Sequence, residues 1–461
     1  MRTVLLVNPP VWFADGEPHT LDTEYPPLGL LYIAAWLRRY TTFVPRVVDV
    51  APQGLTLSDL AGILRRERPF AVGIAAMTLQ LQGAVEVATV VRREAPRCPI
   101  FLGGNHVSGD PTFVERNADL FDHGITREGE RTFADALNRL EAGESLPVML
   151  EGEPIGSLDD LPFPDRTLID RRRYLRPEYL MASRGCPFHC DFCATPALAG
   201  PARRRSASDV LEEIASLVRV SRGRLAFQDD NFTADRDFVF AFCEGVRSRG
   251  WSLRWICSSR IDLVDEELVR SMKQAGCEGI HFGIESGSER LRAESMHKRG
   301  FDNARIRETI RCCRTQGVRA NGFFILGAPG ESVERLEETE DLILHSGLSA
   351  VVISLPLPFP GSGMYERAKR AGVIDEDFLD RFARKALGAG ITGVYPLYLE
   401  SLDHETVSRA MRRLYRRFYL RPEVALDWIR RDLASPRVLV QDLRSGLHLL
   451  ARGTSCRKPF E

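Results

Sequence analysis

Three cysteines lie close together in residues 183–193, which read SRGCPFHCDFC. Their spacing is C-x3-C-x2-C, and they directly follow a predicted strand at Tyr179–Ser183. Thiolates are the protein ligands of iron–sulfur clusters. Three thiolates on a 4Fe–4S cluster leave one iron without a protein ligand, and that iron can bind a small molecule through an amine and a carboxylate. The spacing therefore predicts an open four-iron cluster on Cys186, Cys190 and Cys193.

A structural zinc ion is the alternative, with His189 or a distant residue as the fourth ligand. Zinc sites usually combine two C-x2-C pairs, or a cysteine pair with a histidine pair. The sequence contains no such second half, so we favour the cluster. The remaining cysteines are scattered and are expected to be buried small hydrophobic residues. They are Cys98, Cys243, Cys257, Cys277, Cys312, Cys313 and Cys456.

Composition narrows the class of protein. The net charge of −1 gives no indication of a nucleic-acid partner. No apolar run reaches the roughly 18–20 residues that would span a membrane. The N-terminus lacks the features of a secretory signal peptide. We therefore expect a cytoplasmic protein whose thiols stay reduced.

The length of 461 residues predicts two to three domains. Residues 1–145 alternate short apolar strands with helices, which predicts a doubly wound, Rossmann-like α/β domain with a parallel sheet. Residues 146–178 are turn-rich and are expected to be a linker. Six further strand–helix units over 179–380 predict a partial (β/α)6 barrel. Residues 381–461 are expected to form a helical C-terminal domain, with helices at Thr406–Tyr419 and Val424–Leu433.

The triad, with Phe192 before its third cysteine, resembles the signature of the radical S-adenosylmethionine superfamily. The resemblance covers residues ~178–380, where the predicted strands end in family-like elements such as Gly283-Ile284-Glu285-Ser286-Gly287. It implies that the cluster and nearby side chains bind S-adenosylmethionine. Glu285 is the expected ribose contact, and Ser258, Arg260 or Ser286 the expected contact of the methionine carboxylate. Phe192 is expected beside the cofactor, and Asp229 and Asp230 beside its ammonium or the substrate.

The N-terminal domain resembles the cobalamin-binding class of that superfamily. The resemblance is carried by Tyr25-Pro26-Pro27-Leu28-Gly29, Gly103-Gly104-Asn105-His106 and Glu128-Gly129-Glu130. Ligands of doubly wound sheets lie beyond the carboxyl ends of the strands. The residues that the resemblance places against cobalamin are Pro10, Thr78, Gly103, Gly104, His106, Gly129 and Glu130.

This sequence differs from other cobalamin proteins in the ligand that it offers to cobalt. The motif D-x-H-x-x-G, which supplies a histidine to cobalt, is absent. The resemblance therefore implies cobalamin with its own base displaced and no histidine on cobalt. His106 is expected to contact the nucleotide tail or a loop instead. A dinucleotide is not expected, because G-x-G-x-x-G does not follow the first strand.

The resemblance implies a cobalamin-dependent radical S-adenosylmethionine methyltransferase. Methylcobalamin would donate a methyl group to an unactivated carbon, or to a phosphinate, of a small molecule such as a natural-product intermediate. An external electron donor such as flavodoxin or ferredoxin is expected, with the chain as a monomer. No catalytic residue is assigned.

Three alternatives remain. A non-methylating cyclisation or oxidation is one, because Arg417–Pro422 is similar to an element of anaerobic magnesium-protoporphyrin ester cyclases. A non-catalytic corrinoid or cluster carrier is the second. A methylthiotransferase is the third, but it would need three more cysteines in the N-terminal domain, where only Cys98 lies.

Overall fold

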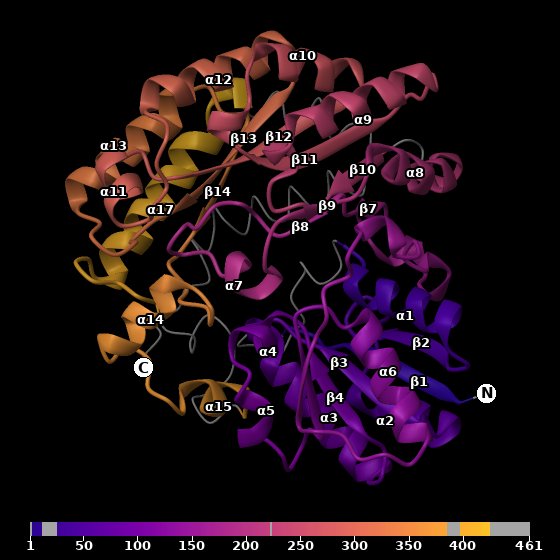
Figure 1. The fold of residues 1–461 in the computed structure, drawn as a ribbon. Helices are drawn as coiled ribbons and strands as arrows, with labels where there is room; N and C mark the ends of the chain where they lie inside the picture. Colours follow the sequence, from indigo (N-terminus) through magenta and orange to yellow (C-terminus); the bar gives the residue numbers. More distant parts are fainter. Residues whose placement is uncertain (1, 12–24, 222–223, 385–396, 425–461) are drawn as a thin grey trace.

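The computed structural model describes residues 2–11, 25–221, 224–384 and 397–424 (Figure 1). Two parallel sheets dominate the molecule. The N-terminal sheet and its helices form the lower body in Figure 1, and the second sheet with its helices arches above it. Among the described residues, no helix is long and apolar enough to cross a membrane.

The first sheet has the order β2-β1-β3-β4-β5-β6, with all neighbours parallel. Residues Val4–Val7 of β1 are fully buried, as expected of a strand that helices cover on both faces. The chain order reverses between β1 and β3, which is where doubly wound sheets bind ligands. The strands are β1 (Thr3–Asn8), β2 (Val44–Asp49), β3 (Ala71–Ala75), β4 (Ile100–Gly103), β5 (His123–Thr126) and β6 (Met149–Glu151).

Helices cover both faces of this sheet. α1 (Leu28–Tyr40) and α6 (Glu130–Glu141) pack on one face. α2 (Leu57–Glu67) and α3 (Leu81–Glu94) pack on the other, together with the short α4 (Asn105–Gly109) and α5 (Phe113–Arg116). The predicted doubly wound α/β fold is therefore confirmed.

Strand β6 lies inside the segment that the sequence predicts to be a linker. It pairs with β5 at the edge of the sheet, where Met149 lies opposite Gly124. Its side chains are half-buried or exposed, so the segment lacks the apolar run by which the other strands are recognised. The domain boundary at 145 stays a prediction.

The second sheet has the order β14-β13-β12-β11-β10-β7, all parallel and open at the ends. It matches the six strand–helix units expected for a partial barrel. Its strands are β7 (Tyr179–Leu180), β10 (Arg224–Phe227), β11 (Arg254–Arg260), β12 (Cys277–Glu285), β13 (Arg319–Ile325) and β14 (Ala350–Ser354). Its helices are α8 (Ala207–Ser221), α9 (Arg236–Ser248), α10 (Glu266–Gln274), α11 (Glu289–Glu294), α12 (Asn303–Thr315) and α13 (Val333–His345).

The outer face of this sheet carries its hydrophobic core. Phe227, Phe242 and Trp255 pack edge to face there. The scattered thiols of Cys243, Cys257, Cys277 and Cys313 are buried in the same core, as expected. Cys98 is buried in the first domain and Cys312 is half-buried, whereas Cys456 lies outside the described residues.

After β14 the chain returns to the first domain. α14 (Gly363–Arg370) and α15 (Phe378–Ala383) place Met364 and Phe382 in the core beside α3 and α5. α17 (His404–Tyr419) instead packs on α13 and the second core. The boundary expected at 380 stays a prediction, and the helix expected at Val424–Leu433 lies outside the described residues except for Val424.

Candidate functional site

A cavity of about 370 Å³ lies between the two sheets. Its lower wall is formed by the carboxyl ends of β3, β4 and β5 and the loop before α6. Its upper wall comes from β8 (Ser183–Arg184), α7 (Thr195–Ala199) and the residues that follow β10. Strand β8 pairs with β9 (Arg203–Arg204), which does not line the cavity. Four of the predicted cobalamin contacts line the lower wall: Gly103, Gly104, Gly129 and Glu130. Asp230 lines the upper wall.

Glycines stand among the apolar side chains of the lower wall, which include Ile33 and Ile125. At Gly104 the φ angle is +98° and an added Cβ would lie 2.8 Å from the Ala76 carbonyl oxygen, so glycine is required. A Cβ at Gly29 would meet nothing within 4 Å, and one at Gly129 nothing closer than 3.5 Å. This bare backbone beside open space fits a large flat group such as a corrin ring.

Pro10, Thr78 and His106 lie behind this wall and do not line the cavity. The Thr78 hydroxyl and His106 Nδ1 are 3.2 Å apart, and His106 is fully buried. Burial lowers the pKa of His106 to about 4. Pro10 packs against Gly83, where a Cβ would lie 2.3 Å from the Pro10 carbonyl oxygen. Contact of these three residues with cobalamin stays a prediction.

The three clustered cysteines occupy the loop between β8 and α7, and each thiol is free and half-buried. Gly185, with φ +82°, turns the chain from β8 into this loop. The Cys193 amide donates to the Cys190 carbonyl oxygen at 3.0 Å, which closes a turn. Among the described residues, no three His, Cys, Asp or Glu side chains converge on a single metal ion.

Two cations lie beside Cys190. Arg260 Nη1 is 4.0 Å from its sulfur, and the guanidinium stacks 3.9 Å from the centre of the Phe188 ring. Lys298 Nζ donates to Glu285 Oε1 at 2.8 Å in a buried ion pair. Burial raises the pKa of the Cys190 thiol, while Lys298 and Arg260 act in the opposite direction. The two cations would stabilise thiolate ligands at this position.

Glu285 ends β12 with φ +71°, a left-handed conformation that is unusual for glutamate. A register shift between β12 and β13 occurs at this residue. Such backbone strain concentrates at functional sites. Sequence reasoning found Glu285 but missed Lys298. The scarcity of lysine in an arginine-rich chain was the available signal.

Two other predicted site residues make buried hydrogen bonds within the protein. Asp229 is fully buried, accepts from the Ala182 amide at 3.0 Å and also accepts from the Ser183 hydroxyl. The Ser286 hydroxyl lies 3.1 Å from that of Thr339 and is fully buried. Neither residue lines the cavity between the sheets, and their contact with S-adenosylmethionine or the substrate stays a prediction.

The other three predicted site residues are more open. Asp230 accepts a hydrogen bond from the Thr195 hydroxyl at 3.2 Å, and burial raises its pKa. Phe192 packs against Met296 on one side and against the first core on the other. Ser258 is half-buried and lies two residues before Arg260 on β11.

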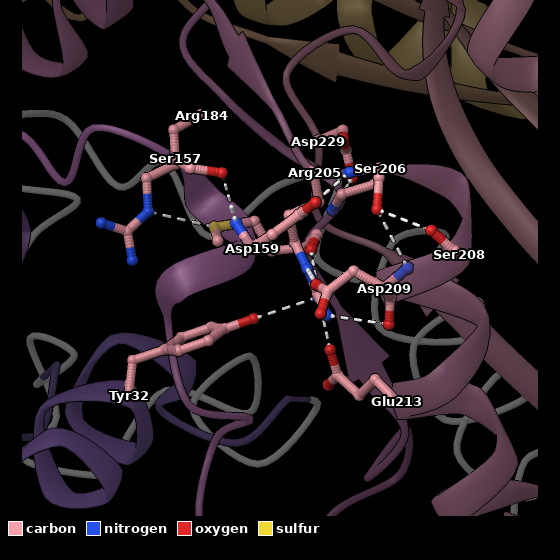
Figure 2. A network of polar contacts seen from close by, with 12 residues as sticks. Tyr32, Ser157, Asp159, Arg184, Arg205, Ser206, Ser208, Asp209, Glu213 and Asp229 are labelled. Atoms are coloured by element: carbon pink, nitrogen blue, oxygen red, sulfur yellow. Dashed lines mark hydrogen bonds and ion pairs between the residues drawn. The ribbon is translucent and has the colours of Figure 1, made fainter.

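Charged contacts join the two domains around the cavity. In Figure 2, Tyr32 of α1 points toward Arg205, whose Nη1 lies 3.4 Å from the Tyr32 hydroxyl and is paired with Glu213. Arg184 is 2.5 Å from Glu130 and 3.3 Å from Glu128 across the domain boundary. Glu130, a predicted cofactor contact, is therefore held by an arginine of the second domain.

Comparison with known families agrees with this geometry. The model of the radical SAM superfamily matches residues 180–343, and that of the B12 binding domain matches residues 19–137. The chain therefore carries a B12-binding domain followed by a radical SAM domain. The cavity lies where these two matched regions face each other.

Individual relatives extend over nearly the whole chain. An uncharacterized methyltransferase of Pyrococcus horikoshii is 29% identical over 445 residues, which cover 92% of this chain and 94% of the relative. Cytidylyl-2-hydroxyethylphosphonate methyltransferase of Streptomyces wedmorensis is 28% identical, covering 92% and 91%. The structure of the radical S-adenosylmethionine methyltransferase TsrM from Kitasatospora setae, solved with cobalamin and a [4Fe-4S] cluster, has a TM-score of 0.71 at 18% identity, covering 92% and 89%.

Proposed function

We propose that this chain is a cobalamin-dependent radical S-adenosylmethionine methyltransferase that acts on a small molecule. The observation that carries the proposal is one cavity with two facing walls. The glycine-bearing strand ends of the first sheet line one wall, and residues that flank the cysteine loop line the other. Relatives that cover nine-tenths of the chain are methyltransferases, which supports methylation.

The residues around the triad have separable roles in this proposal. Cys186, Cys190 and Cys193 would hold the cluster, and Arg260 and Lys298 would stabilise its thiolates. Glu285 is oriented by Lys298 and presents a carboxylate suited to ribose hydroxyls. Asp230 presents an acceptor into the cavity for an ammonium group.

The first domain supplies the opposite wall. Gly103, Gly104 and Gly129 would let a corrin ring lie on the strand ends. When bound, the cluster would supply one electron to S-adenosylmethionine, and cobalamin would supply the transferred methyl group. We also propose that the chain works in the cytoplasm as a monomer, with flavodoxin or ferredoxin as the reductant.

The test supplies methyl-labelled S-adenosylmethionine, cobalamin and a reductant to the anaerobically reconstituted chain. We expect release of 5′-deoxyadenosine and label in the cobalamin fraction. Cys190→Ala should abolish deoxyadenosine release, whereas Cys312→Ala, which changes a half-buried thiol on α12, should leave it unchanged. Deoxyadenosine release with unlabelled cobalamin would reject methylation in favour of cyclisation or oxidation.

A further inference from the structure

A row of polar side chains crosses the inner face of the second sheet. His281 on β12 is flanked by Ile280 and Phe282, which are fully buried in the outer core. Because side chains alternate along a strand, His281 projects from the opposite, inner face. In the strand register it lies between Ser258 on β11 and Asn321 on β13.

Two atoms of this row are buried without a partner. His281 Nδ1 and Asn321 Oδ1 are both shielded from solvent, and neither makes a hydrogen bond within the described chain. Buried polar atoms are nearly always hydrogen-bonded, so an unpaired pair on one face of a sheet requires an explanation. On the same face of the sheet, Val352 of β14 remains 43% exposed.

The row lies below the candidate site. Glu285 follows His281 by four residues on β12, a rise of about 13 Å at roughly 3.3 Å per residue. The ring of Phe323 stacks on His281 with centroids 5.5 Å apart and a 23° interplanar angle, and so adds a flat wall. A substrate bound beside Glu285 would have to extend over about this distance to reach the row with its far end.

The chemistry of the row favours an uncharged group. Burial, together with Arg176 and Arg319, lowers the pKa of His281 to about 4, so the imidazole is neutral near pH 7. Arg319 lies 3.8 Å from Glu278, which also pairs with Arg254. The carbonyl oxygen of Asn321 can only accept a hydrogen bond. The oxygen of a bound anion would lie against the Asn321 oxygen, and both atoms accept hydrogen bonds. A ligand N–H or O–H group would instead donate a hydrogen bond to the Asn321 oxygen.

We propose that Ser258, His281 and Asn321 bind the far end of the substrate through an uncharged, planar group that carries a hydrogen-bond donor, such as a carboxamide or a ring lactam. The identity of this ligand as the methyl acceptor rests on the proposed function, but the binding itself does not. Ser258, expected from sequence to hold the methionine carboxylate, is then a substrate contact.

The test measures binding of three probes to the reconstituted full chain by saturation-transfer NMR. Benzamide carries the required donor, N,N-dimethylbenzamide lacks it, and benzoate is an anion. We expect benzamide to bind about tenfold more tightly than either analogue, the factor that corresponds to one hydrogen bond. His281→Phe, which keeps the stacked ring, and Asn321→Leu should each weaken benzamide binding by about tenfold.

The matched control is His345→Phe, because His345 is exposed on α13 and should leave benzamide binding and deoxyadenosine release unchanged. Three outcomes would each overturn the inference. Benzamide does not bind, the three probes bind equally well, or the His281 and Asn321 variants bind benzamide as tightly as the unmodified chain. Label transfer to cobalamin is scored separately, so the inference and the proposed function can fail independently.

Discussion

At the scale of single residues, Glu285 combines burial, a left-handed backbone and an ion pair with Lys298. An amide at this position would keep the geometry but lose the charge. Glu285→Gln should therefore raise the KM for S-adenosylmethionine about tenfold or more, as the loss of one charged hydrogen bond implies. The KM is obtained from the rate of deoxyadenosine release at a series of S-adenosylmethionine concentrations.

The control for this change is Glu294→Gln, which alters an exposed carboxylate on α11. Iron content should be the same in both variants. An unchanged KM in Glu285→Gln would remove Glu285 from the cofactor site and leave it only as the partner of Lys298.

His106 makes stability depend on pH. Its pKa is about 4 in the folded chain, whereas histidine in an unfolded chain titrates near 6.5. Between these values only the unfolded state is protonated, so stability falls as pH drops from about 6.5 toward 4. Lowering the pH from 7.5 to 5.5 should therefore cost about 1 kcal/mol of stability from this residue, which urea unfolding measures.

His106→Phe should remove that share of the pH dependence while keeping a ring against Phe113. His281 has a similarly low pKa and should keep its own share. His345→Phe, at an exposed position, should leave the profile as it is. A His106→Phe profile identical to that of the unmodified chain would contradict the assignment.

At the scale of elements, α14 holds the cysteine loop in place. The Met364 amide donates to the Asp191 carbonyl oxygen at 3.0 Å, and Arg367 Nη2 pairs with the Asp191 carboxylate at 2.6 Å. A Cβ at Gly363 would lie 2.4 Å from an oxygen of that carboxylate, so a larger residue there would displace the Asp191 side chain. α14 thus fixes the segment between Cys190 and Cys193 from outside the triad.

Arg367→Gln should weaken this contact. The pair is partly buried, so the expected loss of stability is roughly 1–3 kcal/mol, between exposed and buried ion pairs. Thermal unfolding and iron retained after gel filtration measure the two consequences. Arg370→Gln changes an exposed arginine of the same helix and should alter neither.

At the scale of the whole molecule, Glu128 joins the domains. It pairs with Arg203, lies 3.3 Å from Arg184 and accepts from the Ile155 amide at 2.8 Å. Burial acts to raise its pKa, but Arg203 and Arg184 hold it below the usual range. Glu128→Gln would remove the negative charge that neutralises Arg203 and Arg184.

We expect Glu128→Gln to lower the free energy of unfolding by about 3 kcal/mol, as for a broken buried pair. Urea unfolding measures this change. Glu153→Gln is the control, because Glu153 is 71% exposed and its pair with Arg131 spans 3.7 Å. An exposed pair should contribute less than about 1 kcal/mol. Equal losses in the two variants would show that Glu128 does not join the domains energetically.

The features that could be predicted from the sequence are those that follow from the pattern of neighbouring residues. Apolar runs identified the buried parallel strands, and cysteine spacing identified the triad. The edge strand β6 was missed because its side chains are not buried. The pairing of Lys298 with Glu285 and the buried hydrogen bonds of Asp229 and Ser286 join residues that are far apart in the sequence. The spacing of apolar residues carries no information about such contacts. The first domain's interaction with α14 and α15 is of the same kind.

That last packing has a consequence for synthesis. Phe378 and Phe382 of α15 belong to the core of the first domain, yet they follow β6 by more than 200 residues. While the ribosome makes the second sheet, the nascent first domain must wait with part of the apolar surface of α3 and α5 uncovered. Apolar surface exposed during synthesis favours aggregation, so we expect the nascent chain to be prone to aggregate until Ala383 has emerged.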